Sequence, residues 1–498
     1  MTDDMPRPAP VRLNPAWHYH FLGIGGVGMS ALAELLHGRG VRVSGSDTAV
    51  GDTAQSPTLR RLESLGIPVA AGHPPSALEG VDAVVFTPAV SPAHPVWEEV
   101  RRRGLPRLHR AQMLGAVTEG LATLAVSGTH GKTTASACLG FALERAGWDP
   151  TVLVGGHVAQ FGGQNVRAGA GGWCVAEADE SDGSFVHLRP RGILLTNVEA
   201  DHLDHHGSLE NLTASFRAFL ARLEPEGVLA WCADDPGAAA LGRAHGSRTQ
   251  PDQEQPGRTQ PGRTQADRTQ LGHAVSYGAA EDADVRVTVG QLRPGAMDMA
   301  LHDGERRHAL TTRLVGRHNA QNLAGVYALA SRCGVPEAPL LAALAEFAGV
   351  ERRQQFLGRF GPHGCAVFDD YAHHPTEIRA TLEMFLAVYG RPLTVVFQPH
   401  LYSRTRQFAA GFAQALGAAD RVYVTDVYAA RERPEPGVTG ALITGNMKEH
   451  PDARFAATWQ ELIPRLLGAE APRGVLLTLG AGDVTGLGPA LLQEGGRP

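Results

Sequence analysis

Short apolar runs, each followed by a turn and a helical pattern, recur along the chain. Near the N-terminus the run 18–22 leads into a glycine-rich turn, a helical pattern through Leu36 and a second run that ends at Asp47. The run 83–86 repeats this arrangement. Uninterrupted apolar runs of this kind are typical of strands that are buried on both faces. The pattern predicts a largely parallel α/β domain that ends near residue 119.

The same alternation continues through two further blocks. Candidate strands in the middle block are 121–126, 173–176, 192–196 and 227–232. After residue 350 the candidate strands are 366–368, 393–397, 422–425 and 475–479, and a helix is expected at 375–389. We therefore predict an α/β protein of three domains, with bounds 1–119, 120–349 and 350–498.

Three further segments have other sequence patterns. Strict alternation at 284–289 predicts a half-exposed strand, and 323–330 predicts a helix. Between residues 247 and 272 the triplet Arg-Thr-Gln recurs among Pro, Gly and Asp, with no aliphatic residue before Leu271. Such a segment cannot bury a core, so we predict a disordered insertion, an expanded surface loop in preference to a functional tail.

Composition narrows the class of protein. The net charge is −6 among 498 residues, which favours neither nucleic-acid nor anionic-membrane binding. Five cysteines lack paired metal spacing, as expected of free thiols in a reducing compartment. No apolar run is long enough for a membrane helix, and residues 1–15 lack a signal-peptide segment. A cytoplasmic location is the resulting expectation.

Lysine usage draws attention to one loop. Lys and Arg together number 45, yet only Lys132 and Lys448 are lysines. Lys132 ends the sequence Gly-Thr-His-Gly-Lys after the run 121–126 and is followed by two threonines. Backbone N–H groups at such a helix start hold phosphate oxygens, and a compact ammonium reaches the β and γ phosphates. We therefore predict ATP binding and a P-loop ATPase-like central domain, although Val126 stands where the longer P-loop motif has its first glycine.

A second glycine-rich turn lies near the N-terminus. Gly23, Gly25 and Gly28 follow the first strand, and Asp47 lies about twenty residues further on, at the end of the second strand. This is the layout of a nucleotide-binding βαβ unit, with the acid placed for a ribose. The alternative is that the glycines only permit close helix–strand packing. The pattern favours a Rossmann-like N-terminal domain, and the strands after residue 350 favour a Rossmann-like C-terminal domain.

Acidic residues and histidines follow two central strands. Glu177 begins an acidic run, and His202 lies in a second polar run after the strand 192–196. Magnesium prefers hard oxygen ligands, so Glu177, His202 and the Thr133 hydroxyl are the candidate Mg²⁺ ligands. A solvated acidic loop is the plain alternative. A zinc site made of His202, His205 and His206 has less support, because no thiolate accompanies the histidines.

Further polar motifs lie in the last third of the chain. Asn319 and Asn322 are three residues apart, so both share one face of the helix start and could cap it or bind a base. Histidines and arginines follow two later strands, where they suit a carboxylate and an anionic transition state.

Taken together, these motifs resemble the Mur ligase family. The matching segments are Gly-Ile-Gly-Gly-Val-Gly-Met-Ser (23–30), Gly-Thr-His-Gly-Lys-Thr-Thr (128–134), Glu-Ala-Asp-Glu-Ser-Asp (177–182), Glu-Ala-Asp-His-Leu-Asp (199–204), Gly-Arg-His-Asn (316–319), Asp-Asp-Tyr-Ala-His-His-Pro-Thr-Glu (369–377) and Gln-Pro-His-Leu-Tyr-Ser-Arg-Thr (398–405). The segments occur in the family's order, and the match as a whole spans about residues 18–488. The resemblance implies an N-terminal domain for a UDP-sugar, a central ATPase domain and a C-terminal domain that closes over ATP and an amino acid.

The member resembled uses UDP-N-acetylmuramate, L-alanine and ATP with Mg²⁺, through an acyl phosphate, in peptidoglycan precursor synthesis. The first glycine turn then faces the UDP-sugar, so no redox cofactor is needed. Candidate UDP-sugar residues are Gly25, Gly26, Val27, Gly28, Asp47, Ser91 and Arg110. Candidate ATP residues are Gly128, Thr129, His130, Gly131, Lys132, Thr133, Thr134, Asn319, Asn322, Arg353 and Asp370. Candidate catalytic residues are Lys132, Glu177, His202, His374 and Arg404.

The chain departs from the family pattern at two positions. Leu401 replaces a common arginine, which shifts the expected carboxylate contact to Arg404, and Gln354 replaces a usual phenylalanine. No lysine lies between Lys132 and Lys448, which excludes the carbamoylated lysine of sister ligases from the central domain.

Three alternatives compete with this interpretation. A murein-tripeptide recycling ligase of the same family fits the segment 26–30 and Tyr371 less well. An NAD-linked dehydrogenase leaves the phosphate loop without a role, and a non-enzymatic ATP-binding module leaves the reactive groups without one. We expect a monomer or a weak homodimer.

Overall fold

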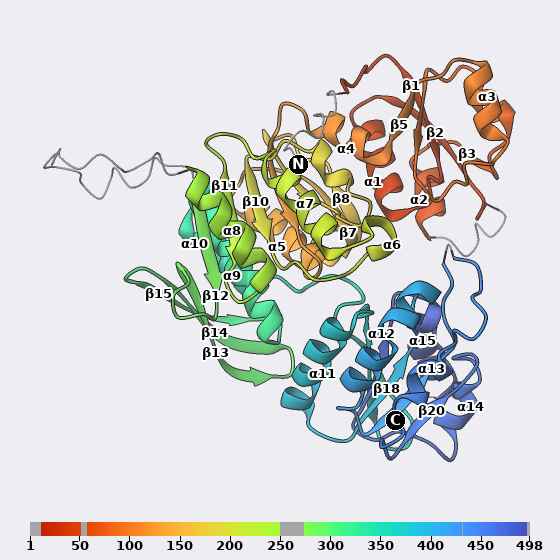
Figure 1. Ribbon diagram of the computed structural model, residues 1–498, viewed down its shortest axis with the longest axis vertical. Coiled ribbons are helices and arrows are strands. Elements are labelled where there is room, and N and C mark those ends of the chain that lie inside the picture. Colours follow the sequence, from red (N-terminus) through yellow and green to blue (C-terminus); the bar gives the residue numbers. More distant parts are fainter. Residues whose placement is uncertain (1–10, 51–56, 250–272, 431, 496–498) are drawn as a thin grey trace, which may run out of the picture. The chain divides into compact units, whose positions relative to one another are not determined.

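The computed structural model describes residues 11–50, 57–249, 273–430 and 432–495 (Figure 1). Internal contacts divide the chain into two compact units. The first comprises Met1–Thr288, Ala300–Leu310 and Gln321–Ala348, and the second comprises Val289–Met299, Thr311–Ala320 and Gly349–Pro498. Three sheets form the framework, as an α/β chain of three repeated blocks predicts. The predicted domain bounds themselves remain predictions.

The N-terminal sheet is parallel and has the order β3-β2-β1-β4-β5. Its strands are β1 (His18–Leu22), β2 (Arg42–Asp47), β3 (Val69–Ala71), β4 (Ala83–Phe86) and β5 (Arg107–His109). Its helices are α1 (Val27–Gly38), α2 (Pro57–Ser64), α3 (Val96–Arg102) and α4 (Arg110–Thr118). Leu22, Val84 and Trp97 belong to a buried cluster that packs α3 against the sheet. This arrangement confirms the predicted parallel α/β unit.

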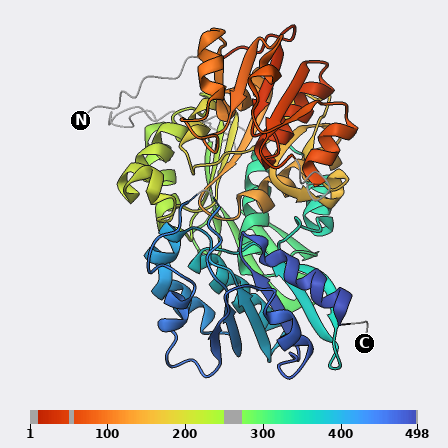
Figure 2. The ribbon, with the colours of Figure 1, turned by 90° about the vertical axis from the view of Figure 1, so that its right-hand side faces the viewer.

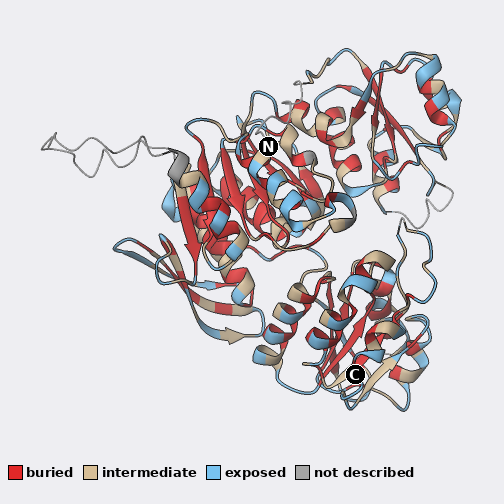
Figure 3. Cartoon of the chain, viewed as in Figure 1, coloured by how far each residue is buried: buried red, intermediate tan, exposed pale blue. Residues whose placement is uncertain are grey.

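The central sheet has ten strands in the order β15-β14-β13-β12-β11-β10-β6-β9-β7-β8. They are β6 (Ala122–Ser127), β7 (Thr151–Val158), β8 (Gln164–Arg167), β9 (Trp173–Glu177), β10 (Gly192–Leu195), β11 (Val228–Cys232), β12 (His273–Gly278), β13 (Val285–Arg293), β14 (Ala296–Asp303) and β15 (Arg306–Thr312). Across the sheet, each neighbouring pair from β13 to β7 in this order is parallel, whereas the edge strand β8 is antiparallel to β7. The buried strands are evident in Figure 3.

Six helices accompany this sheet: α5 (Lys132–Arg145), α6 (Leu203–His206), α7 (Leu209–Leu220), α8 (Pro236–Thr249), α9 (Arg317–Arg332) and α10 (Glu337–Glu346). Helix α8 continues to Thr249, so residues 247–249 are helical and not part of a disordered insertion. The remainder of the predicted insertion, 250–272, lies outside the described residues. Helix α9 begins before the predicted 323–330, so Asn319 and Asn322 both lie in its first turns.

The C-terminal sheet has the order β16-β17-β21-β18-β19-β20. Its strands and helices are drawn in blue tones in Figure 2. Its strands are β16 (Gln355–Phe360), β17 (Cys365–Asp370), β18 (Leu393–Phe397), β19 (Arg421–Val424), β20 (Ala453–Phe455) and β21 (Val475–Leu479). Its helices are α11 (Pro375–Tyr389), α12 (Tyr402–Leu416), α13 (Ala441–Gly445), α14 (Leu462–Leu467) and α15 (Leu487–Glu494). Only β16 pairs in the antiparallel sense, so the predicted largely parallel sheet is confirmed.

Candidate active site

The phosphate loop connects β6 to α5 and is fastened to the end of β10. The backbone N–H of His130 donates to Asn197 Oδ1 at 2.7 Å, and the His130 carbonyl accepts from Thr196 Oγ1 at 2.6 Å. Gly128 and Gly131 have φ values of 131° and 82°, which favour glycine. A Cβ on Gly128 would lie 2.2 Å from Thr196 Oγ1. The loop therefore needs both its glycines and its partner strand.

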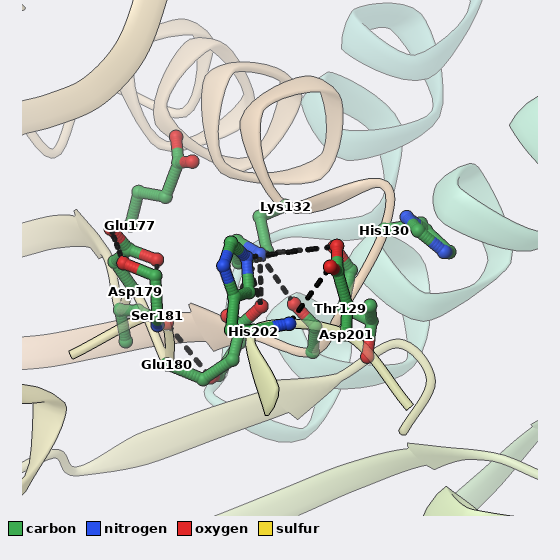
Figure 4. Close-up of polar contacts among 12 residues, drawn as sticks. Thr129, His130, Lys132, Glu177, Asp179, Glu180, Ser181, Asp201 and His202 are labelled. Atoms are coloured by element: carbon green, nitrogen blue, oxygen red, sulfur yellow. Dashed lines mark hydrogen bonds and ion pairs between the residues drawn. The ribbon is translucent and has the colours of Figure 1, made fainter. Parts of the chain in front are cut away.

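Lys132, the first residue of α5, turns back toward its own loop (Figure 4). Its Nζ donates to the carbonyls of Gly128 at 2.7 Å and Thr129 at 3.1 Å, and to Glu180 Oε1 at 2.9 Å. Burial opposes charge on the ammonium, but Glu180 prevails and raises the pKa of Lys132. Burial in turn raises the pKa of the Glu180 carboxyl to about 7, against the opposing effect of Lys132. The lysine is thus a paired cation at a helix N-terminus.

Glu177 lies at the end of β9, on the other side of the first turn of α5. Its Oε1 accepts from Thr133 Oγ1 at 3.0 Å, and its Oε2 accepts from the backbone N–H of Gly155 at 2.6 Å. Burial raises the pKa of Glu177, and Lys132 opposes this shift. A carboxylate and a hydroxyl in contact beside a phosphate loop match the oxygen ligands that Mg²⁺ prefers.

His202 lies at the N-terminus of α6 with a left-handed φ of 53°. Its Nε2 is 3.8 Å from Glu180 Oε1 and 3.7 Å from Asp201 Oδ2, so the imidazole joins the carboxylates around Lys132 (Figure 4). Among the described residues, the ring nitrogens of His202, His205 and His206 do not converge on one point, so the zinc alternative is not supported. The predicted set Lys132, Thr133, Glu177 and His202 therefore gathers in one place within the first unit.

The N-terminal candidates surround the first glycine turn. Asp47 Oδ2 accepts from the N–H of Gly25 at 2.9 Å, so this acid braces the turn. Arg110 begins α4, lies next to Gly28 and has its guanidinium 3.5 Å from Asp182. The remaining candidates, Gly26, Val27 and Ser91, are at the start of α1 and in the loop after β4.

Asn319 and Asn322 both lie in the first turns of α9, and each makes a different contact. A Cβ on Gly131 would lie 2.5 Å from Asn322 Oδ1, so this asparagine packs against the phosphate loop. The Nδ2 of Asn319 donates to the Val315 carbonyl at 2.9 Å, a bond that ties the helix start to the loop before it.

In the second unit, Arg353 lies just before β16, Asp370 ends β17, and the other candidates follow β17 and β18. Asp370 accepts from the N–H groups of Gln354 and Ala372, both at 2.8 Å, and burial raises its pKa to about 6. Arg353 lies 3.4 Å from Glu377. These contacts make a rigid carboxyl end of the C-terminal sheet.

His374 and Arg404 begin the two helices that follow. His374 caps α11, and its Nδ1 accepts from the N–H of Thr376 at 3.4 Å. Arg404 lies in the first turn of α12 and is 6% exposed. Leu401, the N-cap of α12, has a left-handed φ of 69°, an unusual conformation for a residue with a branched side chain.

Two residues with evident roles were not predicted. Glu180 pairs with Lys132, and Asn197 fastens the phosphate loop. Both lie in polar runs after central strands, which is a sequence signal, but nothing in the acidic run distinguishes Glu180 from Asp179 before the fold is known. Within the described residues, no helix is long and apolar enough to cross a membrane.

Comparison with protein families gives three matches in chain order. The model described as "Mur ligase family, catalytic domain" matches residues 18–120, "Mur ligase middle domain" matches 126–250, and "Mur ligase, glutamate ligase domain" matches 352–482. Together these matches cover most of the chain.

Individual proteins give a consistent result. The UDP-N-acetylmuramate–L-alanine ligase of Kineococcus radiotolerans is 45% identical over 490 residues, covering 95% of each chain. The crystal structure of the UDP-N-acetylmuramate–alanine ligase of Thermotoga maritima has a TM-score of 0.76 at 27% identity, covering 96% of this chain and 98% of that one. A murein peptide ligase of Psychrobacter arcticus, with a TM-score of 0.67 at 23% identity and the same coverage, shares the fold.

Proposed function

This chain belongs to the Mur ligase family, and from that premise we propose that it joins L-alanine to the carboxylate of UDP-N-acetylmuramate at the expense of ATP. The products are UDP-N-acetylmuramoyl-L-alanine, ADP and phosphate, and the reaction serves peptidoglycan precursor synthesis. The observation that carries the proposal is the phosphate loop, in which Lys132 and the Thr133–Glu177 pair meet at the end of β6. The similarity to alanine-adding ligases supplies the substrates.

In the first step the muramoyl carboxylate attacks the γ-phosphorus of ATP, and ADP leaves. Lys132 neutralises negative charge that develops on the phosphoryl oxygens, a contribution that is large where water is excluded. To reach them, Nζ gives up its bonds to the carbonyls of Gly128 and Thr129. These carbonyls belong to a loop that Asn197 already holds through the N–H of His130, so the phosphates bind to a prearranged site.

Magnesium fits the residues present. Thr133 Oγ1 and Glu177 Oε1, which contact each other, and the imidazole of His202 would hold it. When bound, Mg²⁺ supplies positive charge that stabilises the phosphoryl oxygens.

In the second step the amine of L-alanine attacks the acyl phosphate, and phosphate leaves after a tetrahedral intermediate collapses. We assign Arg404 to the carboxylate of L-alanine and His374 to the same part of the site. The support is that Leu401 cannot supply the cation common in relatives, whereas Arg404 lies one helical turn further along α12.

Phosphate release with a panel of amino acids tests the proposal. With UDP-N-acetylmuramate and MgATP present, free L-alanine should support the fastest turnover, with slower use of glycine and L-serine because a methyl pocket discriminates weakly. A preference for an L-alanyl tripeptide over free L-alanine would instead identify a recycling ligase. Phosphate release that does not depend on an acceptor would contradict ligation altogether.

A further inference from the structure

A line of alternating histidine and serine side chains crosses the N-terminal sheet. His18 and His20 lie on β1, Ser44 and Ser46 lie on β2, and His73 follows β3. The register pairs His20 with Ser44, so these alternate positions share one face of the sheet. Each of the five residues is at most 8% exposed. A polar line this deep in a core requires hydrogen bonds along its whole length.

The hydrogen bonds are continuous. Ser44 Oγ lies 2.8 Å from His18 Nε2 and 2.9 Å from His20 Nδ1. Ser46 Oγ lies 3.1 Å from His20 Nε2 and 2.7 Å from His73 Nδ1. Every serine therefore bridges two imidazoles.

The chemistry of the first link fixes the direction of all the others. The Gly80 carbonyl, 3.0 Å from His18 Nδ1, can only accept, so this nitrogen carries the hydrogen. Nε2 of the neutral ring then accepts from the Ser44 hydroxyl, whose oxygen must accept from His20 Nδ1. The same steps repeat to the end of the line. The last ring therefore also carries its hydrogen on Nδ1 and leaves Nε2 as an acceptor.

The rings are neutral, as this assignment requires. Burial lowers the pKa of His20 to about 3, and it also lowers the pKa values of His18 and His73. Neighbouring Asp82 and Asp47 act in the opposite direction on His18 and His73 but do not outweigh burial.

The line ends beside the candidate nucleotide acid. The N–H of Gly72 donates to the carbonyl of Asp47 at 2.8 Å, which places His73 at the carboxyl edge of the sheet, where doubly wound domains bind ligands. Among the described residues, none donates a hydrogen bond to His73 Nε2. This nitrogen is not completely buried, so a ligand can reach it. His94 contacts the ring edge-on at 5.2 Å.

We propose that this line is a positioning device that fixes the tautomer of His73, so that Nε2 accepts a hydrogen bond from the uridine part of the UDP-sugar. The inference rests on the proposed function. Uridine offers two kinds of donor, the ribose hydroxyls and the N3–H of uracil. A ring locked as an acceptor binds either donor and disfavours a ligand that presents an acceptor at the same point.

Nitrogen NMR of the histidine-labelled full-length protein tests the tautomer without any substitution. His18, His20 and His73 should each show a protonated Nδ1 and an unprotonated Nε2. Adding UDP should shift the His73 Nε2 resonance and leave that of His18 nearly unchanged. A protonated Nε2 at His73 while UDP binds would overturn this inference alone, whereas failure of UDP to bind would contradict the proposed function as well.

Modified nucleotides identify the donor. Binding of UDP, 2′-deoxy-UDP and N3-methyl-UDP is compared by calorimetry for the wild type and His73→Phe. One analogue should bind the wild type roughly fivefold to tenfold more weakly than UDP, as expected for one lost hydrogen bond, and the difference should disappear in the variant. Equal discrimination by both proteins would remove His73 from the uridine site.

Ser44→Ala tests whether the line acts at a distance. The substitution lies three hydrogen bonds from His73, yet it should mix the His73 tautomers and raise the KM for UDP-N-acetylmuramate with little change in the KM for ATP. Thr118→Val is the matched control, because it removes a buried hydroxyl bonded only within its own helix. An unchanged His73 spectrum in folded Ser44→Ala would reduce the line to a packing feature.

Discussion

At Lys132 the difference between an ammonium and a guanidinium becomes measurable. Nζ lies within 3.1 Å of two loop carbonyls and of Glu180, a space without room for a planar five-donor group. Lys132→Arg should lose at least two orders of magnitude in kcat, comparable to the loss of one transition-state donor. Lys448→Arg, which changes the exposed second lysine, should retain full activity. Near-normal turnover of Lys132→Arg would contradict the assigned role.

Arg404 is expected to bind the amino-acid substrate. Arg404→Ala should raise the KM for L-alanine far more than the KM for ATP or UDP-N-acetylmuramate, because only alanine presents its carboxylate there. Arg406→Ala is a suitable control, since Arg406 lies on the same helix and pairs with Glu435 at the surface. Steady-state kinetics with each substrate varied in turn decide the matter. A similar rise in all three constants would assign Arg404 to bracing the domain.

His20 makes the stability of the N-terminal domain depend on pH. Unfolded His20 binds a proton as the pH falls through about 6.5, whereas the folded residue does so only near 3. The unfolded state therefore binds more protons between these values, and stability falls as the pH falls. His20 alone contributes a loss of about 1.6 kcal/mol between pH 6.5 and pH 5.

Hydrogen exchange of the β1 amides, corrected for intrinsic rates, measures this loss. Burial lowers the pKa values of His18 and His73 too, so both act in the same direction. His20→Gln should be less stable than the wild type at pH 7.5 but should show a weaker acid dependence. The same acid dependence in both proteins would show that His20 is already protonated or is accessible in the folded state.

At the scale of elements, prediction succeeded where one signal determined the outcome. Strands β18 and β21 and helix α11 have the predicted bounds, because uninterrupted apolar runs and a proline at the helix start leave few alternatives. Strands β14 and β15 were missed, although Pro-Gly at 294–295 and Asp-Gly at 303–304 mark the turns before them. Residues 296–303 do alternate, with Met297, Met299 and Leu301 buried, but β15 has one buried position, Thr312, so periodicity alone does not identify it.

The connection between α8 and β12 gives an element-scale prediction. Deleting residues 250–272 and joining the ends by a short Gly-Ser turn keeps α8 whole. Loop-closure entropy changes by only about 0.6 kcal/mol per doubling of length, so activity and Tm should stay nearly constant. Calorimetric melting and phosphate release provide the measurement. A fall in Tm of more than about 10 °C would show that this segment packs on the protein, contrary to its composition.

At the scale of the whole molecule, repeated strand–turn–helix blocks were sufficient to predict three α/β sheets. They could not predict which acid of a run meets which cation. Glu180 and Asp179 are neighbours of the same charge type, but only Glu180 reaches the Lys132 ammonium, since the choice depends on how the loop leaves β9. Likewise, the spacing of Gly131 and Asn322 along the chain contains no hint that the two touch.

The histidine–serine line also bears on how β1 finds β2 during folding. In the native register His20 lies opposite Ser44, and the side chain of Val43 is on the other face. A slip by one residue would exchange these faces and set apolar groups against the imidazoles. Each buried ring left without a partner would cost about 1–3 kcal/mol. A purely apolar face could tolerate such a slip. The polar line therefore disfavours any register of β1 and β2 other than the native one.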